Sequence, residues 1–387
     1  MTTQTNDSIS CKLCEAEVHS IKSHLKDCRD NPENLDLAGY KKKFKNAPVL
    51  SDTAKKVLEK RAARVKANEA LTAAKDGFET LELHKTFGLA EVAGVGLNSA
   101  GKPIPFQRMT EHEFQDLVPE VDEHYRHNHE CLRVICIGAL VAYPIYLYGY
   151  SGTGKTTAVE QFCAKANWPM VRVQHTMNME ESQITGQWVL KGKNMEFQPG
   201  LLPLAMKNGW LYLADEYDFT PPHTLSVYQA VLEGKPLVIK EAPEEWRVVK
   251  PHPNFRIMAT GNTNGSGDET GIYAGTQLGN AANYERFAAI FKLDFIEKAQ
   301  EIEILQDRCS VPEAVAKCFL EFASSIRDQV ESGKISIPIS TRALIRACHM
   351  GNLRGSYIKG IELAYANRLP SAENTAVMEL ALRSFGE

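Results

Sequence analysis

A complete phosphate-binding loop lies in the middle of this chain and constrains its fold more than any other feature. The pattern requires glycine, four free positions, glycine, lysine and a hydroxyl residue, and the chain meets it with Gly149, Tyr150, Ser151, Gly152, Thr153, Gly154, Lys155 and Thr156, followed by Thr157. Glycines let the backbone wrap around a polyphosphate, and the next helix points its N-terminal N–H groups at the phosphate oxygens. Apolar residues 144–148 predict a strand before the loop, and residues 157–166 predict a helix after it. This context favours a nucleoside triphosphate site over a chance glycine loop.

Two acidic residues at the end of an apolar run supply the second half of the predicted site. Residues 210–214 predict a buried strand, and Asp215 and Glu216 follow at its carboxyl end, where open α/β sheets bind ligands. We expect Lys155 to reach the β- and γ-phosphates, and Thr156 and Asp215 to hold magnesium. Glu216 is expected to orient and activate the attacking water. Ordinary strands also end in such acids, but a position 60 residues after Lys155 favours the catalytic interpretation.

Two further polar residues fit the same geometry. Asn262 follows the predicted strand Phe255–Thr260 and is expected beside the γ-phosphate, where it would help to position water. Arg286 precedes the fifth predicted strand, and an arginine there can reach the γ-phosphate of a neighbouring subunit. A surface salt bridge is an equally good interpretation of Arg286 from the residues alone.

The pattern of apolar segments predicts an α/β fold. Strands alternate with helices between about residues 130 and 296, which indicates a five-stranded parallel sheet with helices on both faces. After residue 297 apolar positions recur at helical spacing up to the end of the chain. The expected strands are Ile145–Tyr148, Met170–Gln174, Trp210–Ala214, Phe255–Thr260 and Ile290–Phe295.

Composition and charge exclude several classes of protein. The 387 residues carry a formal charge of −4, so the chain has no generally basic coat for nucleic acid, although residues 41–66 hold ten Lys/Arg against two acids. The start has no apolar signal segment, and the longest apolar stretch, residues 134–149, is short for a bilayer, so we expect a cytoplasmic protein without a membrane contact. Nine cysteines then indicate a reducing compartment. The histidines at 124, 127 and 129 are interpreted as a solvated polar turn.

A cluster of soft ligands near the start of the chain predicts zinc. The ligands are Cys11, Cys14, His24 and Cys28, whose spacing is typical of a tetrahedral knuckle, with His19 as an alternative ligand. Residues 11–30 contain four basic and four acidic residues, so the knuckle itself offers no basic face to phosphate. Protein docking is therefore favoured over nucleic-acid binding for this segment.

The motifs together resemble the AAA+ ATPases. Within that class the chain is similar to the MoxR branch, and in particular to the ATPase subunits of aerobic cobaltochelatases, the CobS type. The similarity covers about residues 135–350, and the run from Gly267 to Gln277 is more specific than the phosphate loop. The short spacing of the N-terminal cluster, and the residues Leu37–Lys41 after it, resemble bacterial fingers of the Ros/MucR type, which the cobaltochelatase subunits lack.

The resemblance implies roles that the residues alone leave open. ATP would be the nucleotide, Arg286 an arginine finger acting on the next subunit, and Arg342 a second sensor of the γ-phosphate. The chain would assemble into a hexameric ring, and residues 183–200 would form an insert facing the pore or the client. A second hairpin would follow at residues 237–249. The implied domains are a zinc-finger-like module at 8–45, a charged helix and linker at 46–110, an AAA+ α/β ATPase domain at 111–297 and a helical lid domain at 298–387.

Three functions remain open at this level. The first is the ATPase subunit of a cobalt chelatase, working with a VWA-type partner subunit and a large client subunit. The second is a MoxR-type chaperone ATPase, cellular or viral, acting on another VWA-containing client. The third is an ATPase tethered to nucleic acid through the finger and the basic stretch.

Overall fold

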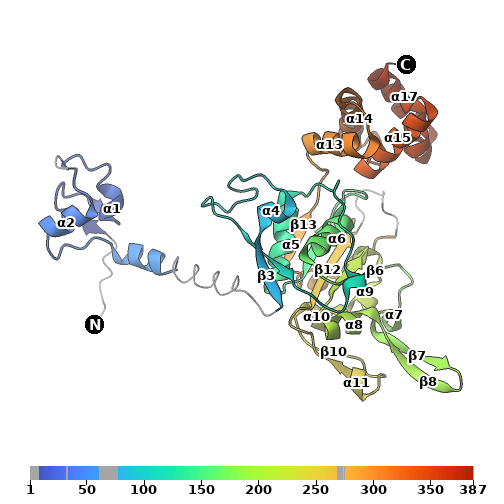
Figure 1. Cartoon of the computed structure of the whole chain (residues 1–387), viewed down its shortest axis with the longest axis horizontal. Coiled ribbons are helices and arrows are strands. Elements are labelled where there is room, and N and C mark those ends of the chain that lie inside the picture. The colour runs from blue at the N-terminus through green and yellow to red at the C-terminus, as the bar shows by residue number, and fades with distance from the viewer. Residues whose placement is uncertain (1–7, 32–33, 61–76, 268–272, 274, 387) are drawn as a thin grey trace. The chain divides into compact units, whose positions relative to one another are not determined.

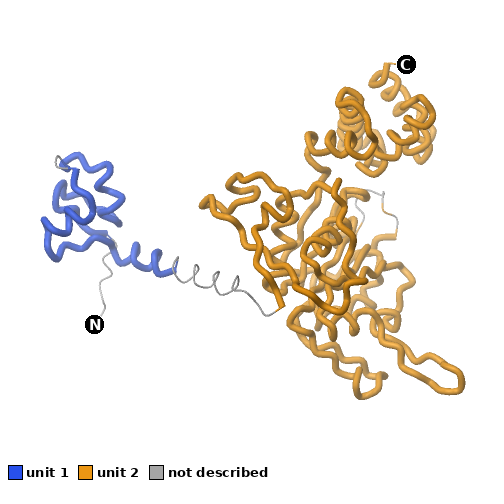
Figure 2. The backbone as a smooth tube through the Cα atoms, in the orientation of Figure 1, with its two compact units in different colours: residues 1–73 blue, residues 74–387 orange. Residues whose placement is uncertain are grey.

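The computed structural model describes residues 8–31, 34–60, 77–267, 273 and 275–386. The chain divides into two compact units, residues 1–73 and residues 74–387 (Figure 2). Each unit has its own apolar core among the described residues.

The N-terminal unit is built around a very small core. Strands β1 (Ile9–Ser10) and β2 (Glu17–Val18) pair antiparallel, and helices α1 (Ile21–His24) and α2 (Leu37–Lys43) follow. The buried core side chains are Ile9, Cys11, Ile21, Leu25 and Tyr40. Backbone hydrogen bonds from Ile21 N to Val49 O and from Ser51 N to His19 O, both 3.0 Å, join residues 49–51 to this core. Residues 52–60 are helical, and residues 61–76 of the expected charged helix and linker lie outside the described residues.

A five-stranded parallel sheet forms the centre of the larger unit, as the sequence predicts (Figure 1). Its strands run in the order β13-β5-β12-β9-β6. Their bounds are β5 (Ile145–Tyr148), β6 (Met170–Gln174), β9 (Leu211–Asp215), β12 (Arg256–Gly261) and β13 (Ala289–Lys292). The first two strands match the expected ranges, the next two are shifted by one residue, and the last ends three residues earlier than expected.

Alternating residues of the central strands enter two separate cores. Ile145 and Leu147 face one core together with Phe162 of α6 (Lys155–Ala166) and Ile135 of α5 (His129–Val141). Tyr146 lies in the other core, which receives side chains from α8 (Leu201–Asn208) and α10 (Tyr228–Leu232). Because successive side chains of a strand point to opposite faces, this division means that helices cover both faces of the sheet.

Residues 78–109 are not part of a linker, as the expected charged helix and linker at 46–110 would require. Strands β3 (Phe78–Glu82) and β4 (Pro105–Met109) pair antiparallel around α4 (Leu83–Phe87). Three aromatic side chains of this segment are buried in the core that contains α5 and α6: Phe78, Phe87 and Phe106. Burial of three aromatic rings gives the segment a fixed place on the domain, and its glycines mark turns within it.

Two hairpins and several short helices complete the domain. Strands β7 (Gly186–Lys191) and β8 (Asn194–Pro199) form the insert expected at 183–200, and Figure 1 shows this hairpin projecting from the body of the domain. A second pair, β10 (Leu237–Val238) and β11 (Val248–Val249), forms the hairpin expected at 237–249. The short helices are η1 (Gln115–Leu117), α7 (Glu181–Thr185), η2 (Tyr217–Phe219), α9 (Pro222–Leu225), α11 (Glu244–Arg247) and α12 (Ala281–Tyr284).

The C-terminal part is helical, as predicted. Its elements are α13 (Lys298–Cys309), α14 (Glu313–Glu331), α15 (Thr341–Arg354), α16 (Tyr357–Ala364), η3 (Ala366–Arg368) and α17 (Ser371–Phe385). Glu301 is fully buried and accepts two 2.8 Å hydrogen bonds from Arg327 and one of 2.7 Å from Thr341, so it joins α13, α14 and α15. Among the described helices, none is long and apolar enough to cross a membrane.

Candidate functional site

The phosphate-binding loop leaves β5 at the carboxyl edge of the sheet and ends where α6 begins. Gly149 passes so close to Leu293 that a Cβ on it would lie 2.3 Å from the Leu293 carbonyl oxygen. Gly152 has a φ of 81°, and a Cβ there would lie 2.6 Å from the Cβ of Ser340 in the C-terminal helical region. Side chains larger than hydrogen are therefore excluded at both positions by contacts from distant parts of the chain.

Lys155 is buried at the start of α6 and folds back onto its own loop. Its Nζ donates to the carbonyl oxygens of Gly149 at 2.7 Å and Tyr150 at 2.9 Å, and to Oδ1 of Asn262 at 3.2 Å. Burial lowers the pKa of Lys155 to about 8, and nearby carboxylates, above all that of Asp218, oppose this shift. The ammonium group thus lies where it can exchange loop carbonyls for phosphate oxygens.

The two residues predicted to hold magnesium lie side by side. Thr156 Oγ1 donates to Asp215 Oδ1 at 2.8 Å, and Thr260 of β12 also donates to this oxygen. The other carboxylate oxygen, Oδ2, accepts from Arg172 of β6 through Nε at 2.7 Å and Nη2 at 2.6 Å. Two charge-assisted contacts from one guanidinium to Oδ2, together with the hydroxyl donors on Oδ1, hold Asp215 in one orientation.

Glu216 follows Asp215 with a left-handed backbone, at a φ of 56°. Its Oε2 accepts a 2.9 Å hydrogen bond from Nε2 of Gln174, the last residue of β6. Arg172 and Gln174 are two positions apart on one strand, so they point to the same face of the sheet. Strand β6 therefore supplies one partner to each of the two acids at the carboxyl end of β9.

The residues of the predicted site surround two adjoining cavities. A narrow cavity of 90 Å³, the phosphate cavity, is lined by residues of the phosphate-binding loop, among them Lys155 and Thr156. Asp215, Glu216, Asn262 and Arg342 complete its lining. A wider cavity of 340 Å³ shares Gly152, Gly154 and Thr157 with it, and extends between residues 122–131 and the C-terminal helices α13 and α15. Together they form a polar cleft that continues into a more apolar one, as a nucleotide with a polar phosphate end and an apolar base requires.

The two predicted arginines lie in different places. Arg342, in the first turn of α15, lines both cavities. Arg286 instead donates from Nε to Glu233 Oε1 at 2.8 Å and from Nη1 to the carbonyl of Ala282. Arg286 lines neither cavity within the described residues. The structure therefore brings Arg342, but not Arg286, to the phosphate-binding loop of the same chain.

Sequence reasoning missed several residues that the fold brings to the site. They are Arg172, Gln174, Asp218 and Thr260 around the acids, and Asp122, Tyr125, Arg308 and Arg346 around the wider cavity. An arginine and a glutamine at alternating positions of an otherwise apolar strand were the only signal for the first two. The specific run from Gly267 to Gln277 is described in part, because residues 268–272 and 274 lie outside the described residues.

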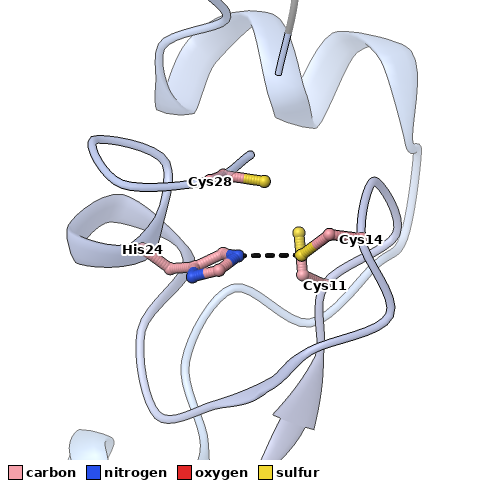
Figure 3. A group of neighbouring side chains, drawn as sticks. All are labelled: Cys11, Cys14, His24 and Cys28. Atoms are coloured by element: carbon pink, nitrogen blue, oxygen red, sulfur yellow. Dashed lines mark hydrogen bonds between the residues drawn. The ribbon is translucent and has the colours of Figure 1, made fainter. Parts of the chain in front are cut away.

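The four predicted zinc ligands converge in the N-terminal unit (Figure 3). Their ligand atoms, three Sγ atoms and one imidazole nitrogen, all lie within 4.8 Å of one another. Cys14 Sγ and His24 Nε2 are 3.0 Å apart. The alternative ligand His19 instead contacts Ser51 Oγ through Nδ1 at 3.2 Å. Three thiols and an imidazole at this separation are a donor set that fits a tetrahedral metal ion.

Two family models match the larger unit, one in its α/β part and one in its C-terminal helical part. Residues 144–274 match the family model of the AAA domain (dynein-related subfamily), and residues 301–369 match the model of the CbbQ/NirQ/NorQ C-terminal region. The aerobic cobaltochelatase subunit CobS of Sinorhizobium sp is 31% identical over 281 residues, which cover 70% of this chain and 83% of that protein. Midasin of Dictyostelium discoideum is 31% identical over 178 residues, 45% of this chain but 3% of its own length.

The fold, the phosphate-binding loop and the acids after β9 define an AAA+ ATPase. The match to CobS assigns the branch: the chain belongs to the AAA+ ATPases of the CbbQ/MoxR type, the family that includes CobS. Among solved structures, the RuvB branch migration motor of Thermotoga maritima is 13% identical, with a TM-score of 0.40 over 64% of this chain and 72% of that one. The family assignment depends on the sequence matches.

His127, between Arg126 and Asn128 of the wider cavity's lining, is buried, which corrects the expectation of a solvated turn at residues 124–129. His127 is 7% exposed and packs edge-on against Phe87 at 4.9 Å and Tyr125 at 4.8 Å between ring centroids. Burial lowers the pKa of His127 from 6.5 to about 4, with a smaller effect from Lys165. The two aromatic neighbours exclude water from the ring and leave no place for a charged imidazolium.

This burial predicts acid sensitivity. The unfolded chain takes up the His127 proton near pH 6.5, while the folded chain resists it down to about pH 4, so stability falls as the pH drops through this window. At pH 5 the expected loss is about 2 kcal/mol. In His127→Phe, the difference between the urea midpoints at pH 7.5 and pH 5 should shrink, whereas the exposed control His124→Gln should keep it. Equal pH dependence in His127→Phe and wild type would contradict the buried neutral state.

Proposed function

We propose that this chain binds ATP with magnesium, hydrolyses it at the carboxyl edge of the sheet, and works in a ring that remodels a partner assembly. One observation carries the proposal. Side chains from three different segments, Lys155 and Thr156 of α6, Asp215 and Glu216 at the carboxyl end of β9, and Asn262 after β12, line a single 90 Å³ cavity beside the loop. Such a gathering of one cation, two acids, a hydroxyl and an amide fits phosphoryl transfer to water.

The residues present fit magnesium. Thr156 Oγ1 and Asp215 Oδ1 are two hard oxygen donors 2.8 Å apart, and magnesium prefers such ligands. Thr156 and Asp215 would hold the ion, which when bound would neutralise phosphate charge. Arg172 occupies the second oxygen of Asp215, which leaves Oδ1 as the oxygen that faces Thr156.

The remaining residues have separate tasks. Lys155 would pair with the terminal phosphates once it leaves the carbonyls of its own loop. Glu216 would accept a proton from the attacking water after release from Gln174, to which it is now bound at 2.9 Å. Asn262 would help to orient that water, since its Oδ1 already lies 3.2 Å from Lys155 Nζ. Arg342, which lines both cavities, would sense the γ-phosphate from the lid.

A ring explains the position of Arg286. AAA+ ATPases of this type typically form oligomeric rings, and in a hexamer the arginine of one subunit would face the nucleotide of the next. Arg286 supports this role because it lines neither cavity of its own chain and is held by Glu233, with 26% of its side chain exposed.

The relationship to CobS suggests the client. A cobalt chelatase assembly would contain a VWA-type partner subunit and a large client subunit, with this chain supplying ATP turnover. The hairpin of β7 and β8 is a candidate client contact, because Leu190 and Met195 pair across it and are 70% and 56% exposed. Trp188, on the same face of the hairpin, donates to the carbonyl of Glu241 at 2.8 Å and joins the insert to the segment between β10 and β11.

The N-terminal cluster would hold one zinc ion through Cys11, Cys14, His24 and Cys28. When bound, zinc would crosslink the β1–β2 turn to α1 and the segment after it. The unit has only five buried core side chains in its described part, and a core this small is rarely stable without a metal or a disulfide. We infer that the unit is a zinc-stabilised module that docks on protein.

Two variants of the nucleotide site should lose different functions, ATP binding in one and ATP turnover in the other. Lys155→Ala should abolish ATP binding, while Glu216→Gln should bind ATP and lose at least about 10²-fold in turnover, because only the proton acceptor is removed. Equilibrium binding of a fluorescent ATP analogue and phosphate release measure the two effects. A Glu216→Gln variant that turns over ATP like wild type would contradict the assigned role.

The same Glu216→Gln variant, loaded with ATP, is a bait for the client in the native host. Recovery of a VWA protein together with a large chelatase subunit would support the cobaltochelatase assignment. Recovery of a different assembly, or of DNA, would keep the motor and contradict the chelatase part. Lys155→Ala is the matched control, since it should not form the ATP-bound state.

The ring predicts that Arg286 acts between subunits. Arg286→Ala should bind ATP normally and hydrolyse it about 10³-fold or more slowly, as expected for loss of an arginine finger. Mixing Arg286→Ala with wild-type chains should lower the activity of the wild-type sites, because each finger serves a neighbour. Normal hydrolysis by assembled Arg286→Ala rings would leave only the surface salt bridge with Glu233 as its role.

The zinc site predicts a metal-dependent N-terminal unit. Purified wild-type chain should contain about one zinc per chain by elemental analysis, and Cys14→Ser should lose it. Chelation should unfold residues 8–51 while ATP binding by the larger unit persists, because structural zinc contributes directly to folding. Cys318→Ser, a cysteine of α14 outside the cluster, is the control and should keep its zinc. Equal zinc content in Cys14→Ser and wild type would contradict the site.

A further inference from the structure

We propose that Asp218 is a positioning residue that sets Asn262 against Lys155 and thereby governs the rate of hydrolysis without contacting ATP. The inference rests on the proposed ATP hydrolysis and adds a residue that the motifs do not include. Asp218 lies in η2, two positions after Glu216, and is 1% exposed.

The Asp218 carboxylate holds the loop after β12 through one oxygen. Oδ2 accepts from the backbone N–H of Asn262 at 2.8 Å, from the backbone N–H of Thr263 at 2.8 Å, and from Thr263 Oγ1 at 3.0 Å. Three donors on a single oxygen fix the direction of the loop at the residue whose side chain enters the phosphate cavity. The side chain of Asn262 then lies 3.2 Å from Lys155 Nζ.

The loop has little freedom to move away from this anchor. On its other side, Tyr146 Oη donates to the carbonyl of Thr263 at 2.6 Å. A Cβ on Gly261 would lie 1.9 Å from Tyr146 Oη and 2.9 Å from Asp218 Cγ, so the backbone fits closely between the two side chains. The carbonyl of Asp218 also accepts from Gln277 N at 2.8 Å, which joins the segment before α12 to the same point.

Burying the carboxylate of Asp218 costs free energy, so a specific role is needed to account for it. Burial raises the pKa of Asp218, and the hydrogen bonds from Thr263 and Asn262 oppose that shift. Its second oxygen, Oδ1, is buried without a hydrogen-bond partner among the described residues. A residue that served packing alone would gain from losing this oxygen, so the anchor for Asn262 is the feature that accounts for the acid.

Two variants of Asp218 distinguish the effect of its hydrogen bonds from the effect of its charge. Asp218→Ala removes the anchor, and it should lower kcat by about 10²-fold, the expected cost of misplacing a catalytic group, with a smaller change in ATP affinity. Asp218→Asn can present its amide oxygen to the same three donors and its amide nitrogen at the unpartnered position, so it should recover part of the lost kcat. Thr263→Val removes one donor and leaves both backbone bonds, and it should lose less than Asp218→Ala.

A double-mutant cycle distinguishes positioning from a general loss of stability. If Asp218 acts through Asn262, the double variant Asp218→Ala/Asn262→Ala should be no slower than Asn262→Ala alone. Additive losses in kcat would overturn the proposal, because they would mean that the two residues act independently.

Hydrogen exchange tests the anchor without any turnover. In Asp218→Ala the amides of Asn262 and Thr263 should lose protection, while those of β9 keep it. Unchanged exchange at residues 262–263 would overturn the proposal. If wild-type rings hydrolyse no ATP, the proposed function fails, and the exchange result still decides whether Asp218 holds this loop.

Discussion

The whole site depends on three neighbouring strands running in the same direction. Strands β5, β12 and β9 pair in parallel, so their carboxyl ends reach one edge of the sheet. The phosphate-binding loop follows the first, Asn262 follows the second, and Asp215 closes the third. Residues more than a hundred positions apart, such as Lys155 and Asn262, are therefore within hydrogen-bonding distance. A different strand order would separate these groups even if every motif were intact.

The buried charged side chains at this edge of the sheet have partners within the protein. Lys155 uses carbonyls of its own loop, Asp215 pairs with Arg172, and Asp218 accepts three donors from the neighbouring loop. An unpaired buried charge would cost several kcal/mol, so these contacts stabilise the site. The loop carbonyls that Lys155 contacts are also partners that a polyphosphate can replace, because Lys155 lines the narrow cavity.

The N-terminal unit differs from the larger unit in having a very small apolar core. Its hairpin and two short helices cannot bury much apolar surface, and its cysteines and histidine lie where a metal would join them. The surface of α2 carries three consecutive exposed lysines, Lys41 to Lys43, while Tyr40 of the same helix is fully buried and accepts from Lys12 N at 2.8 Å. In the proposed zinc-bound form, metal ligation and one aromatic anchor would take the place of the large core that stabilises the ATPase unit.

The sequence by itself determined the phosphate-binding loop, the five parallel strands, the helical C-terminal region and the family, because these depend on local patterns of glycine, apolar and acidic residues. From their spacing it also picked out the three cysteines and the histidine that converge in the N-terminal unit. Only the tertiary structure decided what surrounds the acids: Arg172 and Gln174 come from an edge strand, Asp218 holds a loop that follows a different strand, and residues 78–109 pack as a hairpin rather than forming a linker. These contacts join segments far apart in the chain, and no local pattern records which strand lies beside which or which side chain fills the space between them.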